Sequence, residues 1–119
     1  MNTPARSLAP LSDDGFLFLA DVVNSAASSQ VDLHFTIENQ SYSLISLYPS
    51  LLAKAGQKRV RYSVVELLAL RYILEYFLHE APGLIPNPSF VSGTLPIALA
   101  RECFLAVTSE LNVYGFDSL

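Results

Sequence analysis

The chain has 119 residues and a formal net charge of −4, and charged residues make up only 15% of it. This length allows one ordinary domain and excludes two. The acidic balance argues against nucleic acid as the main partner, because phosphate binding needs clustered Lys and Arg. So little charge leaves few polar side chains to cover a monomer, and we therefore expect some apolar surface to meet another protein.

The cysteine and hydropathy patterns favour a soluble protein of a reducing compartment. Cys103 is the only cysteine, so no internal disulfide can form, and no apolar run follows the basic residue near the N-terminus as a secretory signal requires. The longest apolar stretch, residues 64–78, is interrupted by Glu66, Arg71 and Glu75 and is too short to span a membrane. We expect a cytoplasmic or nuclear location and no membrane partner.

The N-terminal part of the chain predicts a flexible segment followed by a helix. Residues 1–11 contain two prolines and no periodic pattern. Asp13 or Asp14 is the expected N-cap of a helix over residues 16–27. The apolar face of this helix is wider than a single stripe. We therefore expect one of its surfaces to lie on its own domain and the other to need a second chain.

A β-hairpin is the next predicted element. Residues 31–37 alternate strictly between apolar and polar, which is typical of a half-buried strand. Residues 38–40 form a plausible turn, and the alternation resumes at Tyr42 and continues to about Leu47.

Three signals lie between the hairpin and the central helix. Pro49 suits the first turn of a short helix that Gly56 ends, and residues 58–62 predict a third strand. Four of the seven basic residues cluster here: Lys54, Lys58, Arg59 and Arg61. We interpret this cluster as a solvated, charged edge strand, with a basic docking patch as the alternative.

Residues 64–80 predict the central helix of the domain. Ser63 and Glu66 have the spacing of a capping box, and Tyr62 and Leu67 occupy the positions of a hydrophobic staple around it. Past the first turn the polar residues form one narrow line with i, i+4 spacing. They are Arg71, Glu75 and His79.

The remainder of the chain predicts a loop and a last helix. Residues 81–93 hold three prolines and two glycines and predict an irregular loop, and a loop of this length in a small domain often has a binding role. The last helix should begin at residues 94–96 and reach about Leu111. Residues 12–113 thus form a single α+β interaction domain, and residues 114–119 form a short C-terminal tail.

The residues that could carry chemistry are dispersed. His34 and His79 stand on different elements without a second ligand at metal spacing. Cys103 lies on an apolar helix face with no base beside it in the sequence, and the five glycines form no phosphate loop. We therefore expect no metal, no cofactor and no enzymatic activity.

Two short motifs suggest alternatives. Residues 62–68, Tyr-Ser-Val-Val-Glu-Leu-Leu, are similar to the motif by which translational repressors bind the cap-binding initiation factor, although a staple and capping box produce the same spacing. The C-terminal Asp117-Ser118-Leu119 loosely resembles a ligand of PDZ domains.

The order of the predicted elements resembles the BTB/POZ–elongin C superfamily over residues 16–113. The match is carried by the hairpin, by Val60-Arg61-Tyr62 with the helix behind it, by the Tyr76-Phe77 pair and by the apolar run at residues 104–111. Val107 and Thr108 replace two alanines of that last motif. The resemblance implies a small three-stranded sheet, made of the hairpin and one further strand, with about four helices.

The resemblance also implies function by association. Family members are adaptors that dimerise through the helix before the first strand or hold an apolar helix of a larger complex in a C-terminal groove. The implied partner-binding residues are Tyr76, Phe104, Leu105, Thr108 and Leu111. The implied dimerisation residues are Phe16, Leu19, Val22 and Val23. Plain core packing is the alternative for each of them. A small inhibitor or chaperone that masks a partner surface is the alternative for the whole protein.

Overall fold

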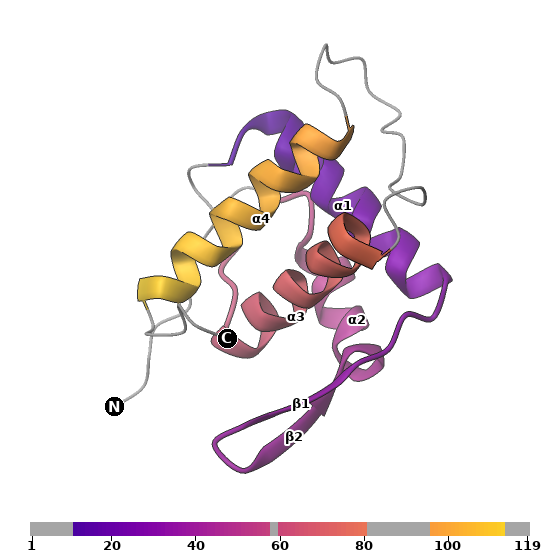
Figure 1. Ribbon diagram of the computed structural model, residues 1–119, viewed down its shortest axis with the longest axis vertical. Helices are drawn as coiled ribbons and strands as arrows, with labels where there is room; N and C mark the ends of the chain where they lie inside the picture. The colour runs from indigo at the N-terminus through magenta and orange to yellow at the C-terminus, as the bar shows by residue number, and fades with distance from the viewer. Residues whose placement is uncertain (1–10, 58–59, 81–95, 114–119) are drawn as a thin grey trace.

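A computed structural model of the chain describes residues 11–57, 60–80 and 96–113, and these residues form an α+β fold (Figure 1). Helix α1 precedes a two-stranded antiparallel hairpin, and the remaining helices follow it. The elements are α1 (Asp13–Ser28), β1 (His34–Ile37), β2 (Gln40–Ser43), α2 (Leu44–Lys54), α3 (Val64–Glu75), the π-helix η1 (Tyr76–Glu80) and α4 (Pro96–Val113). The predicted loop over residues 81–93 and the two terminal segments, 1–10 and 114–119, lie outside the described residues.

Helix α1 begins at Asp13, which is one residue earlier than an N-cap at Asp13 would allow. Ser12 is the N-cap, and its Oγ accepts the backbone N–H of Gly15 at 3.1 Å. Asp13 and Asp14 instead occupy the first turn, where their charge complements the helix dipole. The predicted N-cap was therefore wrong by one or two residues, because a serine hydroxyl competes well with an aspartate for this role.

Both apolar faces of α1 are covered by the chain itself, since α1 contacts α2, α3 and α4. Its buried side chains include Phe16, Leu19, Val22 and Val23. The expectation that this helix needs a second chain to cover these residues is wrong, because the three other helices already enclose them. Leu17 is the large apolar residue that α1 leaves exposed.

The hairpin forms as predicted but ends earlier. Phe35 pairs with Tyr42 in the register, and their rings stack with centroids 5.7 Å apart. Glu38 and Asn39 both have positive φ, of 51° and 68°, as a tight two-residue hairpin turn requires. The strand was predicted to continue to about Leu47, but Ser43 ends it. The Ser43 Oγ accepts the N–H of Ser46 at 3.3 Å and so caps α2.

The described part of the chain contains a two-stranded sheet and not the predicted three-stranded one. Within the predicted strand 58–62, Lys58 and Arg59 lie outside the described residues, and Tyr62 makes only an isolated β-bridge. Pro49 lies inside α2, later than the predicted first-turn position. Gly56 follows α2 with φ of 90°.

The capping box that begins α3 is confirmed. The Ser63 Oγ accepts the N–H of Glu66 at 3.2 Å, and the Glu66 Oε1 accepts the N–H of Ser63 at 2.8 Å. Glu66 is buried and also accepts hydrogen bonds from Lys54 Nζ at 2.7 Å and from the Ser50 hydroxyl. The cap therefore also joins α2 to α3.

Helix α4 completes the core by lying across both α1 and α3 (Figure 1). Cys103 is fully buried, and its Sγ donates to the Gly15 carbonyl of α1 at 3.3 Å. The buried face of α4 repeats at helical spacing. Its residues are Leu99, Ala100, Cys103, Val107, Glu110 and Leu111. Across the described ranges, no helix is both long and apolar enough to cross a bilayer.

Candidate functional site

A π-helical turn borders two hollows of the described surface. Helix α3 ends at Glu75 and continues without a break into η1. A π-helix is rare and occurs mostly as a single turn within an α-helix, frequently at a functional site. Two hollows border this turn, and His79 lines both of them.

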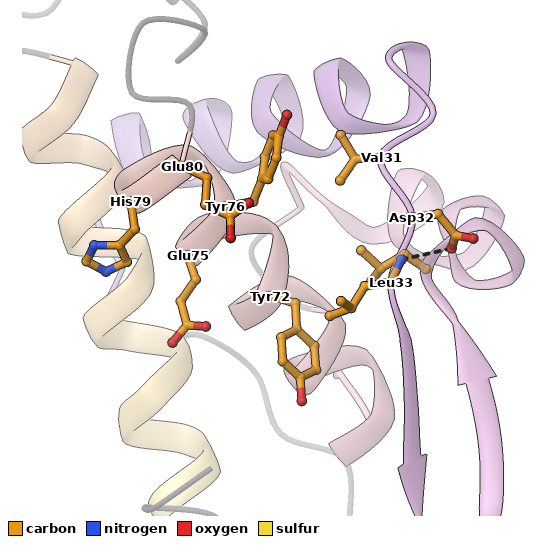
Figure 2. Close-up of a pocket in the computed structure, with 9 residues that line it drawn as sticks. Val31, Asp32, Leu33, Tyr72, Glu75, Tyr76, His79 and Glu80 are labelled. Atoms are coloured by element: carbon orange, nitrogen blue, oxygen red, sulfur yellow. Dashed lines mark hydrogen bonds between the residues drawn. The ribbon is translucent and has the colours of Figure 1, made fainter.

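The first of these, the Tyr72 hollow, lies between η1 and the segment that leads into β1 (Figure 2). Its volume is about 340 Å³. Its apolar lining comes from Val31, Leu33, Leu44, Tyr72 and Tyr76, and its polar lining comes from Asp32, Glu75, His79 and Glu80. Figure 2 shows Tyr72 directed toward β1 and Tyr76 directed toward α1, so the two rings point in opposite directions.

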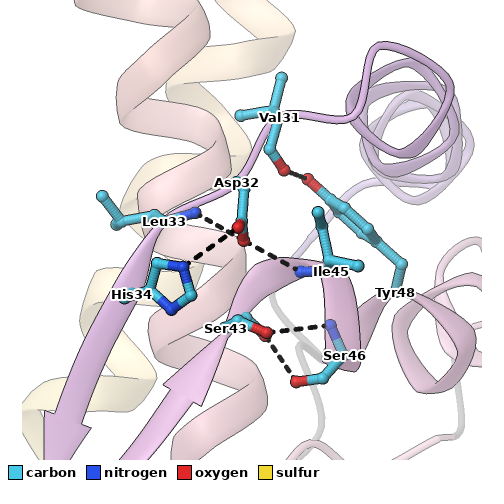
Figure 3. Close-up of polar contacts among 8 residues, drawn as sticks. All are labelled: Val31, Asp32, Leu33, His34, Ser43, Ile45, Ser46 and Tyr48. Carbon is cyan, nitrogen blue, oxygen red and sulfur yellow. Dashed lines mark hydrogen bonds and ion pairs between the residues drawn. The ribbon is translucent and has the colours of Figure 1, made fainter.

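The wall of this hollow at residues 31–33 is held against α2 by hydrogen bonds (Figure 3). The Asp32 Oδ1 accepts the N–H of Leu33 at 2.9 Å and the N–H of Ile45 at 3.4 Å, and its Oδ2 lies 3.2 Å from His34 Nε2. The Tyr48 hydroxyl donates to the Val31 carbonyl. Burial and the Asp32 charge raise the pKa of Tyr48 to about 12, so this hydroxyl keeps its proton at neutral pH.

The rim of the Tyr72 hollow is acidic. Glu75 lies 3.7 Å from Arg71 one turn earlier on α3. The Arg71 side chain is 11% exposed, whereas the Glu75 side chain is 37% exposed. The carboxylate thus faces solvent more than its cationic partner does. Asp32 and Glu80 also line the hollow, but the Asp32 carboxylate is directed away from it, toward α2 (Figure 2).

The second hollow, the Phe104 hollow, has a volume of about 330 Å³ and lies between η1 and α4. It is lined by Leu78, His79, Arg101, Phe104 and Leu105. Leu105 is 67% exposed and is the most exposed of the large apolar side chains on the described surface.

The structure places the predicted partner-binding residues in four environments. Tyr76 lines the Tyr72 hollow, and Phe104 and Leu105 line the Phe104 hollow. Thr108 is half-buried, and its hydroxyl has no hydrogen-bond partner among the described residues. Leu111 is fully buried in the core. Leu111 therefore offers no exposed area to a partner, because the core of the chain already encloses it.

The predicted dimerisation residues form no exposed surface. Phe16 is 3% exposed, and Leu19, Val22 and Val23 have no exposed area. A second copy of the chain could reach these side chains only if α1 left its own core.

The sequence reasoning missed most of the Tyr72 hollow. Leu33, Leu44 and Tyr72 were assigned to strands or to the helix without a binding role. A signal for the hollow was nevertheless present, since Glu75 and His79 belong to the polar line predicted on the central helix. Glu75 and His79 mark the side of α3 and η1 that the core does not cover, whereas Arg71, the third residue of the line, is largely buried.

The described residues offer little for metal or covalent chemistry. No group of three or more His, Cys, Asp or Glu that could hold a metal occurs in residues 11–57, 60–80 and 96–113. Burial, with a smaller effect of the Glu102 charge, raises the pKa of the Cys103 thiol to about 12. A thiol with so high a pKa is a poor nucleophile.

The repressor-like motif is folded into the core. Tyr62 and Leu67 have no exposed area, and Leu68 is nearly as buried. Its spacing is explained by the staple and the capping box. One member of the predicted basic cluster, Lys54, also makes contacts within the domain. Its ammonium group contacts Glu66 and donates to the Arg61 carbonyl at 2.9 Å.

Comparison of the chain with protein-family models, with curated proteins and with solved structures gives no match. The BTB/POZ–elongin C resemblance therefore stays a prediction from the sequence.

Proposed function

We propose that this chain is a non-enzymatic protein-interaction domain that holds an apolar segment of a partner polypeptide at the two hollows that share His79. The observation that carries the proposal is the position of η1. This π-helical turn contributes Tyr76, His79 and Glu80 to one hollow and Leu78 and His79 to the other.

The size and lining of the hollows support a polypeptide ligand. Pockets that enclose a whole small molecule span about 300–1,000 Å³, so each hollow, at about 340 and 330 Å³, is at the lower end of that range. Two neighbouring hollows of this size suit successive apolar side chains on one segment.

Exposed leucines at both hollows supply the energy for such a contact. Leu33 at the Tyr72 hollow is 39% exposed, and Leu105 at the Phe104 hollow is 67% exposed. Complete burial of a leucine side chain contributes about 1.5–3 kcal/mol. Covering the exposed parts of both leucines would therefore contribute a substantial share of the binding free energy.

A different polypeptide is a better candidate than a second copy of the chain. The self-association predicted from the sequence depended on four residues of α1, and all four are buried in the core of the chain. They are Phe16, Leu19, Val22 and Val23. The adaptor role then depends on the surface at η1 alone.

Site-directed photocrosslinking in cells that express the protein tests this proposal. A photoreactive phenylalanine replaces Leu33 or Leu105 at the hollows, or Leu17 on α1 as the matched control, because Leu17 is also an exposed leucine at 46%. We expect the same partner protein to be crosslinked from positions 33 and 105 and not from position 17. Equal crosslinking from all three positions, or none from 33 and 105, would contradict the proposal.

A further inference from the structure

We infer that the segment bound in the Tyr72 hollow carries a lysine or arginine next to its apolar anchor. This inference rests on the proposed function and specifies the chemistry of the partner. It is carried by the combination of an apolar, aromatic lining with an acidic rim in one hollow.

Two carboxylates, those of Glu75 and Glu80, lie at the hollow, whereas the Asp32 carboxylate is directed away from it, toward α2 (Figure 2). Asp32 accepts two backbone N–H groups, from Leu33 and Ile45, and these bonds hold its carboxylate on the α2 side of the segment. The histidine at 3.2 Å from Asp32, His34, is 78% exposed and does not line the hollow. Glu80 is exposed at the end of η1.

The cation nearest to these carboxylates, Arg71, is largely buried. Its side chain lies beside Glu75 and is not part of the hollow's lining, where His79 is the one basic side chain. The charge presented to an approaching ligand is therefore predominantly negative. The net charge of −4 on the whole chain acts in the same direction.

A basic side chain fits this lining in two ways. Its aliphatic stem can lie along Leu33 while its charged end remains in water near a carboxylate. Its charge is also attracted to the face of a tyrosine ring, and Tyr72 and Tyr76 both line the hollow. An acidic segment would be repelled by the same rim. Charges at a rim mainly set partner choice and association rate, so the apolar anchor supplies most of the affinity.

Selection from a library of short random peptides, displayed on phage against the folded chain, tests the inference. We expect the enriched peptides to share an apolar residue with Lys or Arg within one helical turn of it. Dissociation constants of the enriched peptides are then measured by fluorescence anisotropy. We expect the double variant E75Q/E80Q to weaken binding about tenfold. E38Q, which removes a carboxylate at the hairpin tip, should leave it unchanged.

Salt provides a second measurement on the same peptides. Raising the ionic strength from about 0.1 M to about 1 M shortens the screening length from about 10 Å to about 3 Å. We expect peptide binding to the native chain to weaken over this range. Binding to E75Q/E80Q should change less.

The outcomes separate this inference from the proposed function. Enriched apolar peptides without basic residues, lost with Leu33→Asp but unaffected by E75Q/E80Q, would overturn the inference and leave the proposed function standing. Peptides that bind equally well to Leu33→Asp, Leu105→Asp and E75Q/E80Q would overturn both. Failure to enrich any peptide would also count against both.

Discussion

The carboxylate of Glu66 joins three parts of the chain at one buried point. It closes the capping box at Ser63, accepts from Lys54 on α2 at 2.7 Å and accepts from the Ser50 hydroxyl. Burial by itself raises the pKa of Glu66, but the hydrogen bonds from Lys54, Ser50 and Ser63 outweigh it, so the pKa is lower than its ordinary value of 4.5. The charged form is therefore the form that stabilises the fold.

The linkage between this pKa and folding predicts sensitivity to acid. A carboxylate whose pKa is lower in the folded state than in the unfolded state stabilises the fold above the unfolded pKa, and this contribution is lost as the pH falls through the folded pKa. We expect the free energy of unfolding, from urea titrations, to decrease as the pH falls below about 4.5.

The variant E66Q tests the source of this dependence. We expect it to lower the free energy of unfolding at pH 7 by about 1.5–3 kcal/mol, the range for hydrogen bonds to a charged group. It should also flatten the pH dependence. E80Q, at an exposed carboxylate, is the control and should retain the native profile. An E66Q protein with native stability at pH 7 would contradict this account.

At this scale the sequence predicted local contacts and not tertiary ones. The reciprocal bonds of Ser63 and Glu66 follow from their spacing alone, whereas the bonds from Lys54 and Ser50 depend on how α2 meets α3. The same distinction explains the predicted dimerisation residues. An apolar face shows that a side chain must be buried, but it does not show which chain buries it.

Among the elements, the predictions failed where a short-range cap overrode a longer pattern. Alternation continued in the sequence past Tyr42, but Ser43 provided an N-cap and α2 began at Leu44. The π-turn at Tyr76–Glu80 had no local signal, because the i, i+4 spacing of Arg71, Glu75 and His79 reads as regular α-helix. The first helix, the hairpin and the last helix were predicted correctly in type and order because their periodic patterns are long.

The junction after α2 yields a test at the level of an element. Gly56 has φ of 90°, and a Cβ added there would lie 3.2 Å from the Cβ of Ala20 on α1. We expect G56A to lower the free energy of unfolding by about 1–3 kcal/mol, the usual cost of a side chain in this backbone region. Thermal and urea denaturation measure it. A53G, at an exposed α2 position, is the control and should cost only about 1 kcal/mol.

For the molecule as a whole, Cys103 reports on the contact between α4 and α1. It is fully buried and donates to the Gly15 carbonyl, so its thiol is reached only when α4 moves away from α1. We expect labelling by a thiol reagent to be very slow in water and to accelerate in urea in parallel with global unfolding. S109C adds an exposed thiol on the same helix and should be labelled at once. Rapid labelling of Cys103 in the native protein would contradict a single cooperative core.

The candidate site was predictable only in part, because it is assembled from three distant stretches of chain. Tyr76, Phe104 and Leu105 were predicted and do line hollows. Leu33 and Tyr72 contribute to the Tyr72 hollow only because the segment before β1 is held beside α3. No pattern within either segment determines that arrangement. It follows from two hydrogen bonds that join the segment to α2: the N–H of Ile45 donates to Asp32, and the Tyr48 hydroxyl donates to the Val31 carbonyl.

The hairpin tip offers a practical handle on this molecule. The turn projects away from the helices (Figure 1), and Glu38 and Asn39 are exposed. Extra residues are best tolerated at such exposed turns, because they displace no core contact. An epitope or a fluorescent dye carried there would leave both hollows open. Its rotational diffusion would slow when a second polypeptide docks, giving a readout of complex formation without a label on the binding surface.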